Sequence, residues 1–219
     1  MPAGVQAPIE LIIFDCDGVL VDSETLSARV SQRVLADLGC ELPLSRALEE
    51  FTGASTEVYT ARVAELVGRV LEPGWDDCYR SWFTGALETE LQAIPGIHEC
   101  LEGLSVPTCV ASNSGHDRIR RSLDVTGLLT RFDGRIFSAE DVARGKPAPD
   151  VFLWAAQSMG VAPAACVVVE DSPFGVHAAR AAGMRVLGYA AATPAERLEG
   201  EQTVIFDDMA DVPRLLSTL

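Results

Sequence analysis

The sequence predicts an α/β protein, with a doubly wound, mostly parallel sheet of the Rossmann type and an inserted module that contains only helices. Two observations predict the sheet: short apolar runs recur along the chain, and helical patterns lie between them. A third predicts the insert, because one long segment near the N-terminus shows helical patterns alone. Alternating strands and helices are typical of a parallel sheet with helices on both faces.

The predicted strands are continuous apolar runs, as expected for strands that are buried on both faces of a parallel sheet. The first covers residues 9–14 and ends abruptly in acidic residues and glycine. Similar runs follow at residues 106–111, 166–169, 184–189 and 203–206. Helical patterns lie between the runs at residues 97–104, 116–123, 150–159 and 175–182.

The insert is predicted from the segment that follows the first strand. Apolar residues recur every four positions from Leu26 to Leu38, and Gly39 supplies a stop. A second amphipathic pattern starts at Val58 and is expected to end at Pro73-Gly74, and helical character continues over residues 75–91. No strand pattern interrupts this stretch. We therefore expect a helical domain, residues 23–93, inserted into a core domain formed by residues 1–22 and 94–219.

The composition and the net charge argue against several classes of binding partner. The formal net charge of −15 argues against a nucleic-acid or anionic-membrane surface, and no apolar run approaches the length of a membrane helix. The N-terminal residues do not resemble a signal peptide, and the six cysteines are scattered without a C-x-x-C pair. These features predict a cytoplasmic protein with no nucleic-acid or membrane partner, and we expect a monomer or weak homo-oligomer.

The first candidate functional residues are the two acids that follow the first strand, in Asp15-Cys16-Asp17-Gly18. Residues two apart in extended backbone point the same way, so Asp15 and Asp17 are expected to face one pocket. The carboxyl ends of parallel strands are where open α/β sheets bind ligands. Two acids there are suited to binding a cation or to nucleophilic and acid–base chemistry. They are equally typical of a turn after any strand.

Three further segments follow predicted strands or precede predicted helices: Ser112-Asn113-Ser114-Gly115, Lys146-Pro147 and Glu170-Asp171-Ser172. Hydroxyls and backbone N–H groups at a helix start suit a phosphate, and a lysine neutralises one. A strongly acidic protein needs such a lysine or a metal ion to hold an anion. Each segment alone also fits a helix cap or a solvated side chain. Together, in one chain and in this order, they predict phosphoryl-transfer chemistry.

The four segments resemble the motifs of the haloacid dehalogenase superfamily of phosphotransferases. The first motif is the run from Phe14 to Glu24, Ser112 matches the second, Lys146-Pro147 the third and Glu170-Asp171 the fourth. The resemblance covers nearly the whole chain, and the helical insert resembles that family's mobile cap. The nearest branch holds β-phosphoglucomutases and sugar-phosphate phosphatases, including those acting on 6-phosphogluconate.

The resemblance implies a role for each core residue. Asp15 attacks phosphorus and forms an aspartyl-phosphate, while Asp17 protonates the leaving group and then takes a proton from water. The implied cofactor is Mg²⁺, bound by Asp15, Asp171 and the backbone carbonyl of Asp17, with Glu170 orienting the metal shell. Lys146 and Ser112 hold phosphate oxygens, with Asn113 as a helper.

The cap loop is expected to contribute to substrate binding through residues 53–56, with Ser55 and Thr56 as the candidate contacts. Ser55 is equally suited to capping the helix that follows. These assignments predict a Mg²⁺-dependent phosphatase that hydrolyses a small sugar or sugar-acid phosphate monoester.

Three other activities compete with this prediction. β-Phosphoglucomutases carry His where this chain has Ser27 and Arg where it has Thr56, so water is the expected phosphate acceptor. A halide-removing enzyme has no use for Asp17, and a signalling receiver domain needs a long-lived acyl-phosphate and no cap. A catalytically idle sugar-phosphate binder is the remaining alternative.

Overall fold

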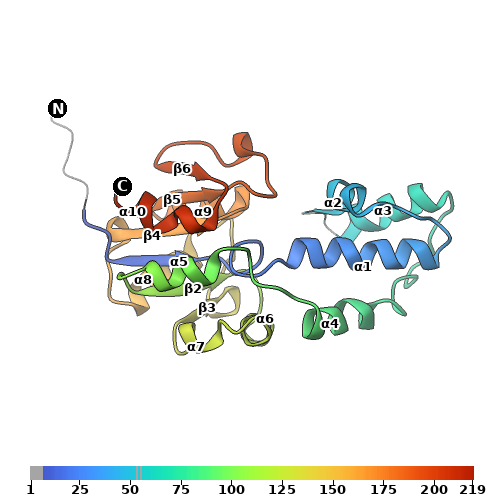
Figure 1. Ribbon diagram of the computed structural model, residues 1–219, viewed down its shortest axis with the longest axis horizontal. Helices are drawn as coiled ribbons and strands as arrows, with labels where there is room; N and C mark the ends of the chain where they lie inside the picture. The colour runs from blue at the N-terminus through green and yellow to red at the C-terminus, as the bar shows by residue number, and fades with distance from the viewer. Residues whose placement is uncertain (1–6, 53, 55) are drawn as a thin grey trace. The chain divides into compact units, whose positions relative to one another are not determined.

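The computed structural model describes residues 7–52, 54 and 56–219 (Figure 1). The chain divides into two compact units, one formed by Met1–Val21 with Ala93–Leu219 and the other by Asp22–Gln92. These bounds differ by one residue from those expected for the two domains. Within the described ranges, none of the helices combines the length and apolar character needed to cross a membrane.

The first unit contains a six-stranded parallel sheet with the order β3-β2-β1-β4-β5-β6. Its strands are β1 (Leu11–Phe14), β2 (Thr108–Ser112), β3 (Ile136–Ser138), β4 (Cys166–Glu170), β5 (Arg185–Tyr189) and β6 (Thr203–Phe206). The chain builds outward from β1 to β3 and then returns to the other side of β1. The direction of winding therefore reverses between β1 and β4, the place where open α/β sheets bind ligands.

The register of the central strands aligns their carboxyl ends. Phe14 of β1 lies opposite Val110 of β2 and Val169 of β4. The backbone N–H of Asp15 donates to the carbonyl of Val169 at 3.0 Å. Asp15 therefore leaves the sheet beside the last residue of β4 and close to the end of β2.

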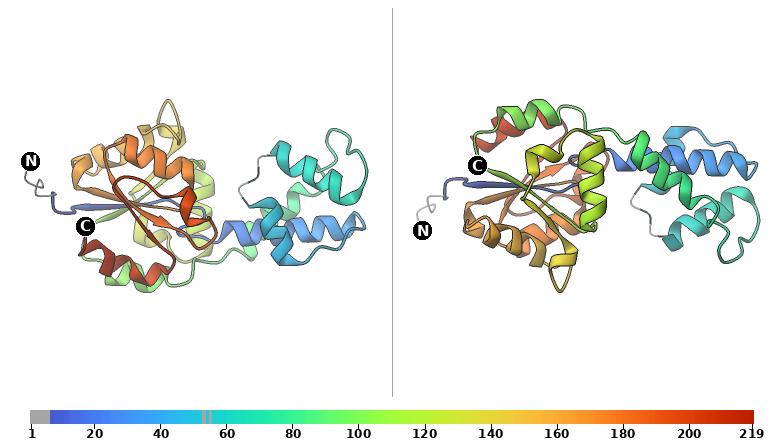
Figure 2. Two further views of the ribbon diagram at one scale, coloured as in Figure 1. Left: turned by 90° about the horizontal axis from the view of Figure 1, so that it is seen from above. Right: turned by 90° about the horizontal axis from the view of Figure 1, so that it is seen from below.

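Helices cover both faces of the sheet (Figure 2). Helices α8 (Asp150–Ser158) and α9 (Pro173–Ala181) lie on one face, where they pack against Leu11 and Ile13. The opposite face is covered by α5 (Ile97–Gly103), α6 (His116–Val125), α7 (Leu129–Phe132) and α10 (Val212–Leu216). All four residues of β1 are fully buried, which explains why its sequence is continuously apolar. The predicted doubly wound α/β fold is confirmed.

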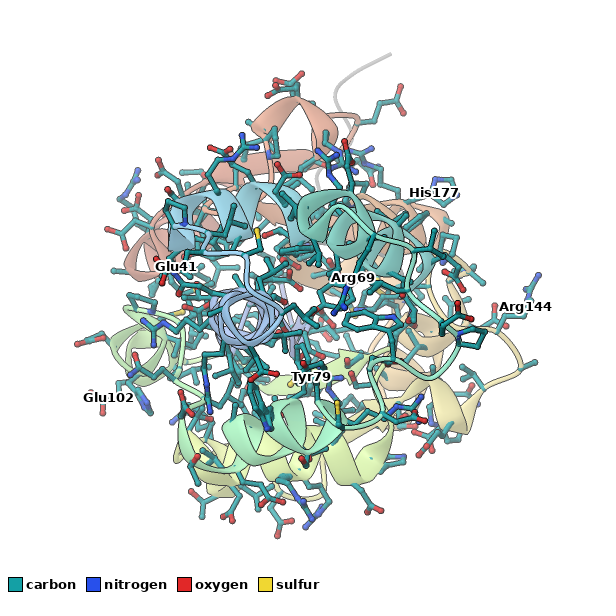
Figure 3. All side chains as sticks on the ribbon, turned by 90° about the vertical axis from the view of Figure 1, so that its right-hand side faces the viewer. Glu41, Arg69, Tyr79, Glu102, Arg144 and His177 are labelled. Atoms are coloured by element: carbon teal, nitrogen blue, oxygen red, sulfur yellow. The ribbon has the colours of Figure 1, made fainter. Side chains whose placement is uncertain are left out.

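The second unit, in the part that is described, contains the helices α1 (Ser23–Asp37), α2 (Leu44–Phe51), α3 (Thr56–Val67) and α4 (Arg80–Thr89). Its apolar core includes Leu35, Phe51 and Val63. Tyr79, labelled in Figure 3, donates a hydrogen bond to the Asp37 carboxylate at 2.6 Å and so ties the segment before α4 to the end of α1.

Three expectations for the elements were wrong. The sheet has a sixth strand, β3, which is only three residues long and too short to show a pattern. Helix α3 ends before Gly68, which takes a left-handed φ of +72°, rather than at Pro73-Gly74. The segment from Trp75 to Tyr79 forms turns, and the helix begins only at Arg80. The predicted stop at Gly39, with φ of +87°, is confirmed.

Candidate active site

The four strand-end segments meet in the first unit, at the carboxyl edge of the sheet. They line a cavity of about 160 Å³. Its lining residues are Asp15, Asp17, Ser112, Asn113, Ser114, Lys146, Glu170, Ser172 and Phe174. A larger cavity, of about 390 Å³, is lined by Leu104, Arg185 and Leu216 among others, and none of its lining residues is acidic. The smaller cavity is the candidate active site, because it brings together residues of all four segments.

Lys146 lies between two buried carboxylates. Its Nζ donates to Asp15 Oδ1 and to Glu170 Oε1, each at 2.7 Å. The exposed fraction of the side chain is 4% for Lys146, 11% for Asp15 and 0% for Glu170. Charges this deeply buried are costly unless they are paired, and here each has a partner.

Burial and pairing act in opposite directions on these groups. Burial raises the pKa of Asp15 to about 7, although the Lys146 ammonium opposes this rise; the Glu170 carboxylate adds to it by repulsion. For Lys146, burial lowers the pKa, but attraction to Asp15 and Glu170 outweighs it and leaves the pKa above its usual value. The ammonium therefore stays charged.

Glu170 is held at both of its oxygens. Oε1 accepts from Lys146, and Oε2 accepts from the backbone N–H and the hydroxyl of Ser172, at 3.0 and 2.9 Å. Ser172 in turn caps α9 by accepting from the Gly175 N–H. A Cβ at Gly175 would lie 1.8 Å from Glu170 Oε1, so only glycine fits against this carboxylate. Glu170 is thus suited to orienting Lys146 more than to binding a metal directly.

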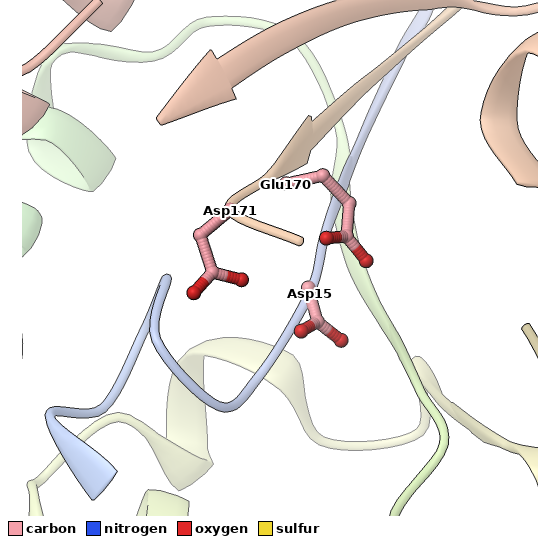
Figure 4. A group of neighbouring side chains, drawn as sticks. All are labelled: Asp15, Glu170 and Asp171. Atoms are coloured by element: carbon pink, nitrogen blue, oxygen red, sulfur yellow. The ribbon is translucent and has the colours of Figure 1, made fainter. Parts of the chain in front are cut away.

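Three carboxylates form a group that fits a hard cation (Figure 4). Asp15, Glu170 and Asp171 each offer an oxygen, and these oxygens lie within 4.8 Å of one another. Anionic oxygen donors at the mouth of a parallel sheet are the ligands that Mg²⁺ prefers. Gly18 passes so close to this group that a Cβ there would lie 2.1 Å from Asp171 Oδ2. Both oxygens of Glu170 already accept hydrogen bonds, so direct binding of a cation by Glu170 would require one of these bonds to be given up.

The carboxylate of Asp17 is not part of this three-residue group. Its Oδ2 accepts from the Ser114 hydroxyl at 2.8 Å, and its Oδ1 accepts from Arg118 Nη2 at 3.1 Å. It still lines the same cavity as Asp15, as the alternation of extended backbone predicts. The contact with Arg118 was not expected from the sequence, because a basic residue in the first two turns of a helix is an ordinary surface feature.

Asn113, which was expected to help to hold phosphate oxygens, contacts the backbone of Lys146 instead. Its amide Nδ2 donates to the carbonyl of Lys146 at 3.1 Å, and its Oδ1 accepts from the Lys146 N–H at 2.8 Å. The Asn113 side chain therefore holds the backbone of the lysine loop, while Ser112 Oγ accepts from the Ser114 N–H at 3.1 Å. Both residues line the cavity, but the amide of Asn113 is already paired.

The residues expected in the cap loop lie in the second unit. Ser55 lies outside the described residues, and Thr56 is exposed at the start of α3. The grouping of the core residues is thus a property of the first unit alone. The candidate site combines a buried carboxylate with a raised pKa, a charged lysine and a second carboxylate that lines the same cavity. It also contains three carboxylates close enough together to bind a metal ion. These are the components of nucleophilic phosphoryl transfer.

Comparisons with known proteins agree with this chemistry. The 6-phosphogluconate phosphatase of Escherichia coli is 28% identical over 208 residues, 94% of each chain. A probable pseudouridine-5'-phosphatase of Drosophila melanogaster is 34% identical, over 87% of this chain and 84% of that protein. Among solved structures, a hydrolase from Deinococcus radiodurans with bound phosphate and sodium has a TM-score of 0.85 and 34% identity, over 97% and 96% of the two chains. The family model for haloacid dehalogenase-like hydrolases matches residues 12–189, and the chain belongs to that family.

Proposed function

We propose that this protein is a Mg²⁺-dependent phosphatase that hydrolyses a small sugar or sugar-acid phosphate monoester through an aspartyl-phosphate on Asp15. The observation that carries the proposal is the buried contact of Asp15 with Lys146, at 2.7 Å, beside the carboxylate of Asp171. The names of the relatives support it, since one is a 6-phosphogluconate phosphatase and another is a probable pseudouridine-5'-phosphatase.

In the first step, an oxygen of Asp15 forms a bond to phosphorus while the ester P–O bond breaks. The alkoxide that leaves takes a proton from Asp17. In the second step, water attacks the phosphorus of the acyl-phosphate and gives a proton to Asp17, which regenerates both carboxyl groups and releases phosphate. Lys146 and Ser112 hold the non-reacting oxygens, and Asn113 acts by holding the Lys146 loop.

The acidic group fits a magnesium ion by its chemistry, with Asp15 and Asp171 as carboxylate ligands and the backbone carbonyl of Asp17 as a third. When bound, Mg²⁺ would offset the repulsion between the phosphate and the carboxylates and stabilise charge in the transition state. Glu170 acts indirectly, since both of its oxygens already accept hydrogen bonds.

The helical domain, residues 23–93, is proposed to act as a cap that selects the leaving group, with Ser55 and Thr56 among its contacts. Water is the proposed acceptor, because Ser27 and Thr56 stand where β-phosphoglucomutases carry His and Arg.

The test is release of inorganic phosphate from a panel of 6-phosphogluconate, glucose 6-phosphate, phosphoglycolate and β-glucose 1-phosphate, with Mg²⁺ and with EDTA. Release is expected from one or a few esters, and EDTA is expected to abolish it, because the cavity already holds several carboxylates. Formation of glucose 6-phosphate from β-glucose 1-phosphate, without phosphate release, would show instead that the acceptor is a sugar.

A further inference from the structure

We infer that Arg118, together with Ser114, is a positioning residue that aims the carboxylate of Asp17 at the leaving group. This inference rests on the proposed function, since it assigns to Asp17 the proton transfers of that mechanism. It concerns α6, a helix that carries none of the residues to which the proposed mechanism assigns a role.

Both oxygens of Asp17 have a fixed donor. The Ser114 hydroxyl donates to Oδ2 at 2.8 Å and Arg118 Nη2 donates to Oδ1 at 3.1 Å. A carboxylate held at one oxygen can still turn about its Cβ–Cγ bond, whereas two donors from different directions fix its plane. The pair therefore determines which way the carboxylate of Asp17 faces.

Ser114 is itself anchored at the end of the sheet. Its N–H donates to Ser112 Oγ at 3.1 Å, and its carbonyl accepts from the hydroxyl of Ser138, a fully buried residue at the end of β3, at 2.7 Å. The orientation of Asp17 is thus connected through Ser114 to the carboxyl ends of β2 and β3. Groups locked by such contacts hold the precise geometry that proton transfer needs.

Arg118 is carried by a helix that is fixed at its start. The N–H of His116, the first residue of α6, donates to Glu140 Oε2 at 3.1 Å, and Ile119 next to Arg118 is fully buried. The side chain of Arg118 is 51% exposed and that of Asp17 is 25% exposed. An ion pair this exposed adds little to stability. Its effect is therefore expected in the orientation of Asp17 rather than in the stability of the fold.

The orientation of Asp17 matters most in the first step, in which the leaving group takes its proton. A sugar alkoxide is strongly basic and needs a proton as it leaves, whereas 4-nitrophenolate is weakly basic and leaves without one. Misplacing a general acid therefore slows hydrolysis of a sugar phosphate and spares an aryl phosphate. The ratio of kcat/KM for the two esters measures the effect, because kcat/KM reports the steps up to phosphoryl transfer to Asp15.

The experiment compares Arg118→Met with Arg120→Met. Arg120 lies on the same helix, is 49% exposed and pairs with Asp133 at 3.4 Å, so it is a matched control outside the site. For the best sugar phosphate of the panel, Arg118→Met is expected to lower kcat/KM by about 10- to 100-fold. For 4-nitrophenyl phosphate the change is expected to stay within about twofold, and Arg118→Lys should recover part of the loss, since it retains a cationic donor. Arg120→Met should match the wild type on both esters.

A second variant tests the partnership. Because Ser114 and Arg118 hold the same carboxylate, the double variant Ser114→Ala/Arg118→Met is expected to lose less than the product of the single losses. Equal losses on both esters would show that Arg118 acts on binding or folding, and unchanged kinetics would show that it has no role; either result overturns the inference. Failure of the wild type to hydrolyse any ester would instead reject the proposed function.

Discussion

Lys146 is the residue on which the charge balance of the site depends, because it lies between Asp15 and Glu170 at 2.7 Å from each. Its position could be predicted from the sequence only as a motif, since a lysine before two prolines is usually solvated. The contact with Glu170 depends on the fourth segment, Glu170-Asp171-Ser172, in which Ser172 holds the Glu170 carboxylate, and no local pattern connects that segment to Lys146. The contact of Asn113 with the Lys146 backbone and that of Arg118 with Asp17 escaped prediction for the same reason: the partners are distant in the sequence.

Replacement of Lys146 by Met is expected to remove phosphatase activity and to lower the free energy of unfolding by about 3–5 kcal/mol, because two buried carboxylates then face each other without a cation. Urea denaturation of the metal-free protein measures the change. Arg144→Met is the control, since Arg144 lies in the same loop and pairs with Asp150 in solvent. The control is expected to unfold like the wild type; an equal loss in both variants would show that the loop, not the buried pair, sets the stability.

At the level of elements, the parallel strands were predictable because burial on both faces leaves a continuous apolar run. Strand β3 was not, because Ile136–Ser138 is too short for periodicity and is specified by pairing with β2. The end of α3 was misplaced because Gly68, with its positive φ, ends the helix before the stronger Pro73-Gly74 signal is reached. Two possible helix ends, Gly68 and Pro73-Gly74, lie close together in the sequence, and only the folded structure shows which of them ends the helix.

The turn after β1 requires a glycine at position 18. This residue has φ of +78°, and a Cβ there would lie 2.1 Å from Asp171 Oδ2. Gly18→Ala is therefore expected to displace Asp171 and to weaken Mg²⁺ binding by roughly tenfold or more. Calorimetric titration with Mg²⁺ measures the affinity.

Gly134→Ala is the matched control for this variant. Gly134 also has a positive φ, +73°, but a Cβ there would meet nothing within 4 Å. Both substitutions carry a backbone cost of roughly 1–2 kcal/mol, yet only the one at Gly18 reaches a carboxylate proposed to bind Mg²⁺. Equal Mg²⁺ affinities in the two variants would contradict the placement of Asp171 in the metal site.

For the whole molecule, the net charge of −15 is the feature that a phosphatase must overcome. Lys146 offsets part of this charge locally, and a cation held by the group of Asp15, Glu170 and Asp171 would offset more, while salt screens the remote charges beyond about 10 Å. The sequence predicts the fold, the family and the residues at the strand ends, because these depend on short motifs. The substrate could not be predicted, because the residues proposed to contact the leaving group, such as Thr56, carry no local pattern that specifies a ligand.

The proposed mechanism depends most on Asp15 as the nucleophile, and the direct measurement is to trap the aspartyl-phosphate. The enzyme is mixed with its best ester and Mg²⁺, quenched in acid during turnover and reduced with borohydride, which converts an acyl-phosphate on Asp15 to homoserine. Mass spectrometry should then find the converted residue at position 15 of the wild type and none in Asp15→Asn, which should retain its fold and lose roughly 1,000-fold or more in turnover. An unmodified Asp15 in an enzyme that is turning over, or near-normal activity in Asp15→Asn, would contradict the covalent mechanism.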